Sequence, residues 1–343
     1  MAGTTSTLLA EPDAAAQARL HTILRFAAGT TGAFIISEAM GWYPTFLGPL
    51  LAAVLLANLP MAPPLKLGLV LIGVQAAGAY GAYILTSLLH ETPVVLFGAI
   101  ALILLLCFAN LARGRGFLPI LLVLVSFSTV PIVTMMAPEQ AGALAFAFAR
   151  AMTVAVVAVW VTHALWPKLS PPTPPAAQSA FDFPLAMALT GIAIVLPLML
   201  LYLMYGITDA LPVLITTVML VINFDPQRSS IQGIAMMVGN LIGGLIALLA
   251  YALLQIAPSL TTLALITFVI ALLFAIRIER GGPASAVGVL TFNQAIVLFS
   301  LSLTPGGSTP SLWITRLFQF GIACIFAIGT MTLLFPRLKA LAR

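Results

Sequence analysis

The sequence predicts an all-α integral membrane protein with about twelve transmembrane helices, arranged as two parallel six-helix repeats. Composition, the spacing of apolar runs and an internal match predict this fold. Hydrophobic residues make up 62% of the 343 positions and charged residues only 7%, whereas soluble domains carry about 25% charged residues. Backbone polar groups inside lipid need internal partners, so long apolar runs must be helices.

Apolar runs near the roughly 20 residues that cross the hydrocarbon follow one another along the chain. Short segments rich in proline, glycine or charge separate them, and the second and eighth runs are shorter than the others. The expected spans are 21–41, 45–60, 65–89, 93–110, 117–136, 140–166, 184–205, 209–223, 230–254, 259–276, 284–303 and 311–335.

The remaining segments set the expected domain plan. Residues 1–20 form a polar N-terminal lead without a cleavable signal pattern, and 171–182 form a proline-rich cytoplasmic linker, which is semi-extended by composition. The linker divides a first six-span repeat, 21–170, from a second, 183–338, and 339–343 form a C-terminal tail.

The two halves match at a nearly constant offset. Matching residues 165 positions apart include the pairs Gly68 and Gly233, Gly78 and Gly243, Arg115 and Arg280, and Phe127 and Phe292. Because six spans is an even number, both copies enter from the same side, and a pseudo-two-fold axis along the membrane normal is expected. The glycines of the third and ninth spans predict close helix packing.

Charge distribution orients the predicted spans. The net charge of +5 is scattered over span ends, so it indicates topology and not nucleic-acid binding. Lysines and arginines fall on the side of the N terminus and the even-numbered loops, whereas Glu91, Glu139 and Asp209 fall on the other side. Both termini are therefore expected in the cytoplasm.

Two arginines inside apolar spans are the first candidates for function. A charge at the centre of a span costs roughly 2.5–3.5 kcal/mol on insertion scales, and such a residue is a functional-site hypothesis by default. Arg150 lies deep in the sixth span and Arg316 nearer the outer end of the twelfth. A pair of guanidinium groups would bind a carboxylate between the halves; a structural ion pair or snorkelling to the headgroups is the alternative.

Polar residues at or inside the spans are further candidates for substrate binding. Asn293 and Gln294 lie inside the eleventh span, and Asn58 and Asn223 end the short second and eighth spans at matching positions. Short, proline-ended spans at corresponding places in two halves point to a transport site. Ordinary helix ends and helix-to-helix hydrogen bonds are the alternative.

Two carboxylates are candidates for proton coupling. Glu38 lies near the outer end of the first span, and Asp225 precedes Pro226. The alternatives are an interfacial carboxylate for Glu38 and a local pair with Arg228 for Asp225. Arg25, at the start of the first span, is expected to be a cytoplasmic anchor.

The chain contains no nucleotide-binding loop, His/Asp/Glu metal cluster, nucleophile elbow or CxxC pair. No acid, base and nucleophile set is available, so an enzyme is not expected, and neither is a cofactor or a metal. Cys107 and Cys324 lie in apolar runs and are expected to pack as small hydrophobic residues.

Four features of the sequence form one pattern: an arginine early in the first span, the segment Gly41-Trp42-Tyr43-Pro44 continuing through Gly48-Pro49, a glycine-rich third span and a basic turn after the fourth span. This pattern resembles the fusaric acid resistance and aromatic acid exporter superfamily. The resemblance covers both halves and is to a compact bacterial branch. The larger exporters carry a cytoplasmic domain after each six-span half, and here only the linker and a short tail stand in those places.

The resemblance implies a bacterial inner-membrane exporter of aromatic or other organic acids, driven by the proton gradient. The expected partners are a small organic anion, the lipid bilayer, a periplasmic adaptor of the membrane-fusion type and a second copy of the chain in a homo-oligomer. Plant anion channels resemble the same superfamily, so a passive anion channel is an alternative function. A non-transporting scaffold for an envelope or efflux complex is another.

Overall fold

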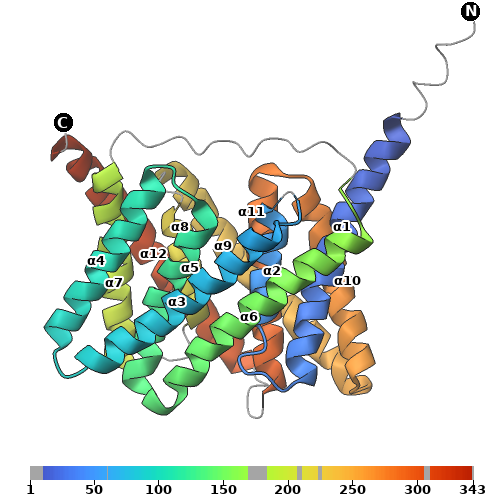
Figure 1. Cartoon of the computed structure of the whole chain (residues 1–343), viewed down its shortest axis with the longest axis horizontal. Helices are drawn as coiled ribbons and strands as arrows, with labels where there is room; N and C mark the ends of the chain where they lie inside the picture. Colours follow the sequence, from blue (N-terminus) through green and yellow to red (C-terminus); the bar gives the residue numbers. More distant parts are fainter. Residues whose placement is uncertain are drawn as a thin grey trace, which may run out of the picture. The chain divides into compact units, whose positions relative to one another are not determined.

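A computed structural model describes residues 11–59, 61–168, 184–206, 211–222, 226–304 and 310–341. Within these ranges the chain forms twelve α-helices and no strand (Figure 1). The helices are α1 (Glu11–Ala39), α2 (Leu47–Asn58), α3 (Leu65–Leu89), α4 (Pro93–Ala112), α5 (Phe117–Met136), α6 (Pro138–Leu165), α7 (Pro184–Tyr205), α8 (Leu211–Ile222), α9 (Pro226–Ile256), α10 (Leu260–Glu279), α11 (Gly282–Leu303) and α12 (Pro310–Leu341).

Each expected span coincides with one of these helices, and the all-helical fold is confirmed. Six helices, α3 to α7 and α10, are long and apolar enough to cross a membrane. The count of twelve spans stays a prediction. The helix α1 begins at Glu11, ten residues before the expected span at residue 21. The segment 11–20 is helical because it contains the good helix formers Ala14, Ala15, Ala16 and Gln17.

Proline sets several helix starts. Among the described helices, α4, α6, α7, α9 and α12 each begin at a proline. Proline suits the first helical position because its missing N–H would have no partner there and its φ is already helical. The prolines that break the apolar runs in the sequence are therefore the residues that begin the next helices.

The helices group into two compact units, and each unit takes segments from both halves of the sequence. Unit 1 comprises Met1–Gly68, Ala151–Pro175 and Ile242–Ser308; unit 2 comprises Leu69–Arg150, Ala176–Leu241 and Thr309–Arg343. The helices α6 and α9 each contribute one part to each unit. The units therefore differ from the two sequence halves divided by the linker.

The two units use corresponding helix pairs. In unit 1, α1 packs against α2 and α10, and α11 packs against α2 and α10 (Figure 1). In unit 2, α7 packs against α8 and α4, and α5 packs against α8 and α4. Replacing each helix by its counterpart six positions along the chain converts these four pairs of one unit into those of the other. In unit 2, α12 also packs against α7 and α8, and α5 against α7. The correspondence of the four pairs is the one that the expected repeats would produce, although the repeats themselves stay a prediction.

Local backbone conformation also corresponds between α1 and α7. Each ends at a glycine with a positive φ: Gly41 has φ 62° and Gly206 has φ 67°. Glycine adopts this left-handed conformation without the steric cost that other residues meet, and it commonly ends a helix in this way. The two positions are 165 residues apart, the offset of the sequence match.

Candidate functional site

Most buried hydroxyl groups of the helices are satisfied locally. The hydroxyls of Thr30, Thr86, Thr190 and Thr267 each donate to the carbonyl four residues earlier, at 2.7–2.8 Å. Such bonds keep serine and threonine compatible with an apolar setting. A buried polar atom without a partner is therefore the exception, and it is where a ligand or a proton is best sought.

Glu38 is one of these exceptions. It lies on the last turn of α1, and its Oε1 atom is buried without a hydrogen-bond partner. The hydroxyl of Thr45, in the turn between α1 and α2, interacts with the carboxylate. Thr45 also shares a hydrogen bond with the hydroxyl of Ser300 on α11. One end of unit 1 therefore holds a carboxylate with two hydroxyls around it.

Close packing of three helices positions this cluster. A β-carbon at Gly48 of α2 would stand 2.9 Å from the Ser37 hydroxyl of α1, so this glycine allows α2 to approach α1. The rings of Phe34 on α1 and Phe299 on α11 lie 6.0 Å apart. These contacts hold α2 and α11 against the last turns of α1, next to Glu38.

The opposite end of unit 1 is basic. The Nε of Arg19 on α1 donates to Oε1 of Glu279 on α10 at 2.9 Å. This hydrogen bond and the charge of Glu279 raise the pKa of the Arg19 guanidinium above its ordinary value. Arg19 is highly exposed, and such a pair contributes little to stability.

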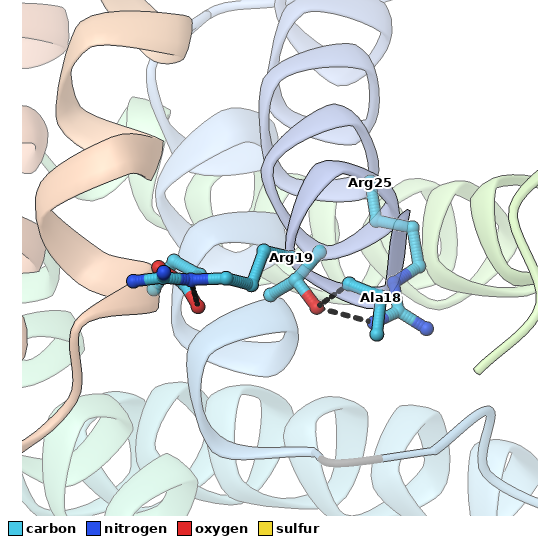
Figure 2. A network of polar contacts seen from close by, with 5 residues as sticks. Ala18, Arg19 and Arg25 are labelled. Atoms are coloured by element: carbon cyan, nitrogen blue, oxygen red, sulfur yellow. Dashed lines mark hydrogen bonds and ion pairs between the residues drawn. The ribbon is translucent and has the colours of Figure 1, made fainter. Parts of the chain in front are cut away.

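Arg25 differs from Arg19 although it lies only six residues further along α1. Figure 2 shows the two side chains leaving the helix in different directions. Arg25 is only 6% exposed. Its Nη2 donates to the Thr22 hydroxyl at 2.9 Å, and its Nη1 contacts the carbonyl oxygen of Trp166, beyond the end of α6, at 3.5 Å. The residue expected to be a cytoplasmic anchor is therefore buried where α1 meets the end of α6.

The two candidate amides of the eleventh span lie in the interior of unit 1. Asn293 is 6% exposed and Gln294 4%, and Oδ1 of Asn293 is buried without a hydrogen-bond partner. A β-carbon at Gly243 of α9 would stand 3.2 Å from Cβ of Gln294. Asn58 is exposed at the end of α2 and donates to the Val54 carbonyl of its own helix at 2.8 Å.

Unit 2 holds a buried amide that was not selected as a site residue from the sequence. Gln75 of α3 is 0% exposed, and its Nε2 donates to the Ser126 hydroxyl of α5 at 3.0 Å. Because that hydroxyl donates its only proton to the Leu122 carbonyl, it can only accept from Gln75. The Oε1 atom of Gln75 is left without a partner.

Arg150 also lies in unit 2, half-buried on α6, with its guanidinium carbon 5.4 Å from the centre of the exposed Phe146 ring one turn earlier. Arg316 is part of α12, but its side chain is not among those described. Asn223 and Asp225 lie outside the described residues.

The structure therefore brings together Asn293 and Gln294 as neighbours on α11, and it separates Glu38 from Asn58, which lie at opposite ends of unit 1. An anion site formed by Arg150 and Arg316 stays a prediction. Within the described ranges, no group of three His, Cys, Asp or Glu side chains is placed to hold a metal ion.

Two family models match the chain in succession. Residues 22–162 match a family described as "protein of unknown function (DUF2955)", and residues 192–329 match one described as "fusaric acid resistance protein-like". No curated protein and no solved structure matches the chain. The two matches, one to each half, confirm the resemblance predicted from the sequence. With the apolar helices, they identify a multi-pass membrane protein of transporter type.

Proposed function

We propose that this protein, a member of the fusaric acid resistance-like superfamily, is a secondary transporter of the bacterial inner membrane that exports aromatic or other organic acids in exchange for protons. The observation that carries the proposal is the match of residues 192–329 to the fusaric acid resistance-like family. Both termini lie in the cytoplasm in this proposal, and a periplasmic adaptor receives the exported acid.

Glu38 is the residue proposed to carry the proton. Its buried, unpartnered Oε1 and the adjacent Thr45 hydroxyl support this role, because a carboxylate inside a membrane protein marks a proton or ion pathway by default. Asp225 is the second proposed carrier, from its place before a proline in the sequence.

Arg150 is proposed to bind the carboxylate of the substrate, with Arg316 as its counterpart in the second half. Its half-buried position within a long apolar helix supports this role, since a guanidinium binds a carboxylate through two parallel hydrogen bonds. Asn293, Gln294, Asn58 and Asn223 are proposed as further substrate-binding residues, because their amides lie within or at the ends of apolar spans of the sequence.

The test is growth of a bacterial host that lacks its own acid exporters on a panel of aromatic and aliphatic acids. The strains carry an empty vector, the wild-type protein, Arg150→Ala or Phe146→Ala, with equal amounts of protein in the membrane. We expect the wild-type protein to raise tolerance to some acids and Arg150→Ala to abolish it, while Phe146→Ala keeps most of it. Unchanged tolerance, with a periplasmic adaptor supplied, contradicts export.

A passive anion channel is the alternative that the same arginines support. Vesicles containing the purified protein separate the two. A transporter accumulates a labelled acid against its gradient when a pH difference is imposed, whereas a channel only equilibrates the acid. A scaffold without transport activity gives neither result.

A further inference from the structure

Arg25 has more hydrogen-bonding capacity and charge than its neighbours use. A guanidinium carries five N–H donors, and the two contacts described for Arg25 end on neutral oxygens, those of Thr22 and Trp166. The Thr22 hydroxyl donates its own proton to the Ala18 carbonyl (Figure 2). Among the described residues, Glu279 lies at the same end of unit 1, and its carboxylate pairs with Arg19. Within the described part of the chain, Arg25 is therefore a buried cation with no anion beside it.

Lys168 adds further positive charge to the surroundings of Arg25. It lies just beyond α6 and is half-buried, as is His163 on the last turns of that helix, and Arg25 and Lys168 each act electrostatically on His163. Two arginines at the end of α10, Arg277 and Arg280, are exposed at the same end of unit 1 as Glu279. Clustered charge of one sign attracts oppositely charged ligands.

A helix cap is the structural alternative for Arg25. The carbonyl end of α6 is the negative end of its helix dipole, and a cation there is favourable. The contact with the Trp166 oxygen, however, is 3.5 Å long, at the outer limit of a hydrogen bond. Capping also leaves Lys168 without an explanation, because it repels the cation that would provide the cap.

We propose that Arg25, with Lys168 and His163 beside it, binds the oxyanion of a carboxylate or a phosphate where α1 meets the end of α6. The anion replaces the distant Trp166 carbonyl as the partner of Nη1, and Lys168 supplies additional charge. The same chemistry serves two sources: a free organic acid on its way to export, or the phosphate of an anionic lipid headgroup. The site lies wholly within unit 1 and does not depend on the direction or coupling of transport.

The experiment measures the thermal midpoint of the full chain, purified in an uncharged detergent, with sodium benzoate, inorganic phosphate or phosphatidylglycerol. Phosphatidylcholine and sodium chloride at equal ionic strength are the controls, because salt screens exposed charges. We expect at least one of the three anions to raise the midpoint, since a ligand that binds only the folded state stabilises it. A rise with phosphatidylglycerol alone identifies a lipid headgroup; a rise with benzoate or phosphate identifies a free anion.

Three variants test the residues. Arg25→Gln keeps a donor for Trp166 and loses the charge, and we expect anion affinity to fall by about tenfold to a hundredfold. Lys168→Gln, whose side chain makes no described hydrogen bond, weakens binding by about threefold at low ionic strength. Arg277→Gln is the matched control: it removes one exposed charge from the same end, and we expect it to weaken binding no more than Lys168→Gln does.

The midpoint without ligand distinguishes a binding residue from a cap. If Arg25 serves a ligand, Arg25→Gln keeps or raises the ligand-free midpoint, because a buried, unpaired charge is removed. A lower ligand-free midpoint together with an unchanged response to anions would show that Arg25 is only a cap. The proposal is also wrong if no anion raises the wild-type midpoint, or if Arg277→Gln weakens binding as much as Arg25→Gln. No gradient is present, so these outcomes leave the proposal of export untouched.

Discussion

Gly243 of α9 lies against the main chain at Ala295 of α11: a β-carbon at position 243 would stand 3.0 Å from the Ala295 amide nitrogen. The main chain cannot move aside as a side-chain tip can, so Gly243→Ala should lower the free energy of unfolding by about 1–3 kcal/mol. Denaturation by a titrated ionic detergent measures this value. Gly32→Ala on α1 is the control, because nothing lies within 4 Å of its added carbon, and it should gain up to about 1 kcal/mol. Equal stability of the two variants would contradict the close approach of α9 and α11.

Gly68 tests a second close contact, in which the neighbour is a side chain. A β-carbon there would collide with Cζ2 of Trp160. The Nε1 of this tryptophan donates to the Pro63 carbonyl at 2.8 Å. We expect Gly68→Ala to be strongly destabilising and Trp160→Phe, which removes Cζ2, to relieve part of the loss. A double-mutant cycle should give a coupling of about 0.5–3 kcal/mol. If the two effects simply add, the indole ring does not lie over Gly68.

Glu38 should react with a hydrophobic carbodiimide, a reagent that modifies protonated carboxyl groups within membranes. We expect mass spectrometry to find the label at Glu38 and not at Glu91, which is exposed in the turn between α3 and α4. Glu38→Gln should keep the fold and remove the dependence of acid export on the pH difference, since the amide cannot carry a proton. Glu91→Gln serves as the control, and export that keeps its proton dependence in Glu38→Gln would assign coupling to another residue.

The pair Gln75 and Ser126 should respond asymmetrically to substitution. Ser126→Ala leaves the buried Nε2 of Gln75 without its described acceptor, and an unpaired buried group costs about 1–3 kcal/mol. Gln75→Leu removes the amide together with its unpartnered Oε1 and should be close to neutral, since volume is nearly conserved. The measurement is again the free energy of unfolding. Ser128→Ala is the control, because that hydroxyl bonds within its own helix to the Val125 carbonyl. Equal losses in the two test variants would mean that Oε1 of Gln75 is satisfied.

The sequence predicts the helices well because prolines, glycines and charged residues clearly mark the ends of its apolar runs. The spans 65–89 and 117–136 agree with α3 and α5 to the residue, since proline, glycine or charge stands at their borders. The start of α1 was missed because residues 11–20 are polar, and hydropathy does not distinguish a polar helix from a polar loop.

The sequence identifies candidate residues but not their surroundings. Glu38 stands out because a carboxylate in a span is rare, but the hydroxyls near it come from a turn and from α11, and no local pattern links Thr45 to Ser300. The burial of Arg25 depends on its contact with the end of α6, which no local sequence pattern predicts. The sequence carries one signal for this residue: no acidic residue lies within four positions of Arg25, so neighbouring turns of its own helix offer it no ion-pair partner.

Each unit contains helices from both halves of the sequence, and this affects the order in which the units can form during synthesis. The helix α1 is complete at Ala39, whereas its neighbour α10 begins at Leu260, so α1 is synthesised long before the helix it packs against. During synthesis of residues 40–259, the face of α1 that later contacts α10 lacks that partner. Domains usually fold as units from the N-terminal end during synthesis, but unit 1 can be completed only after most of the chain has been made.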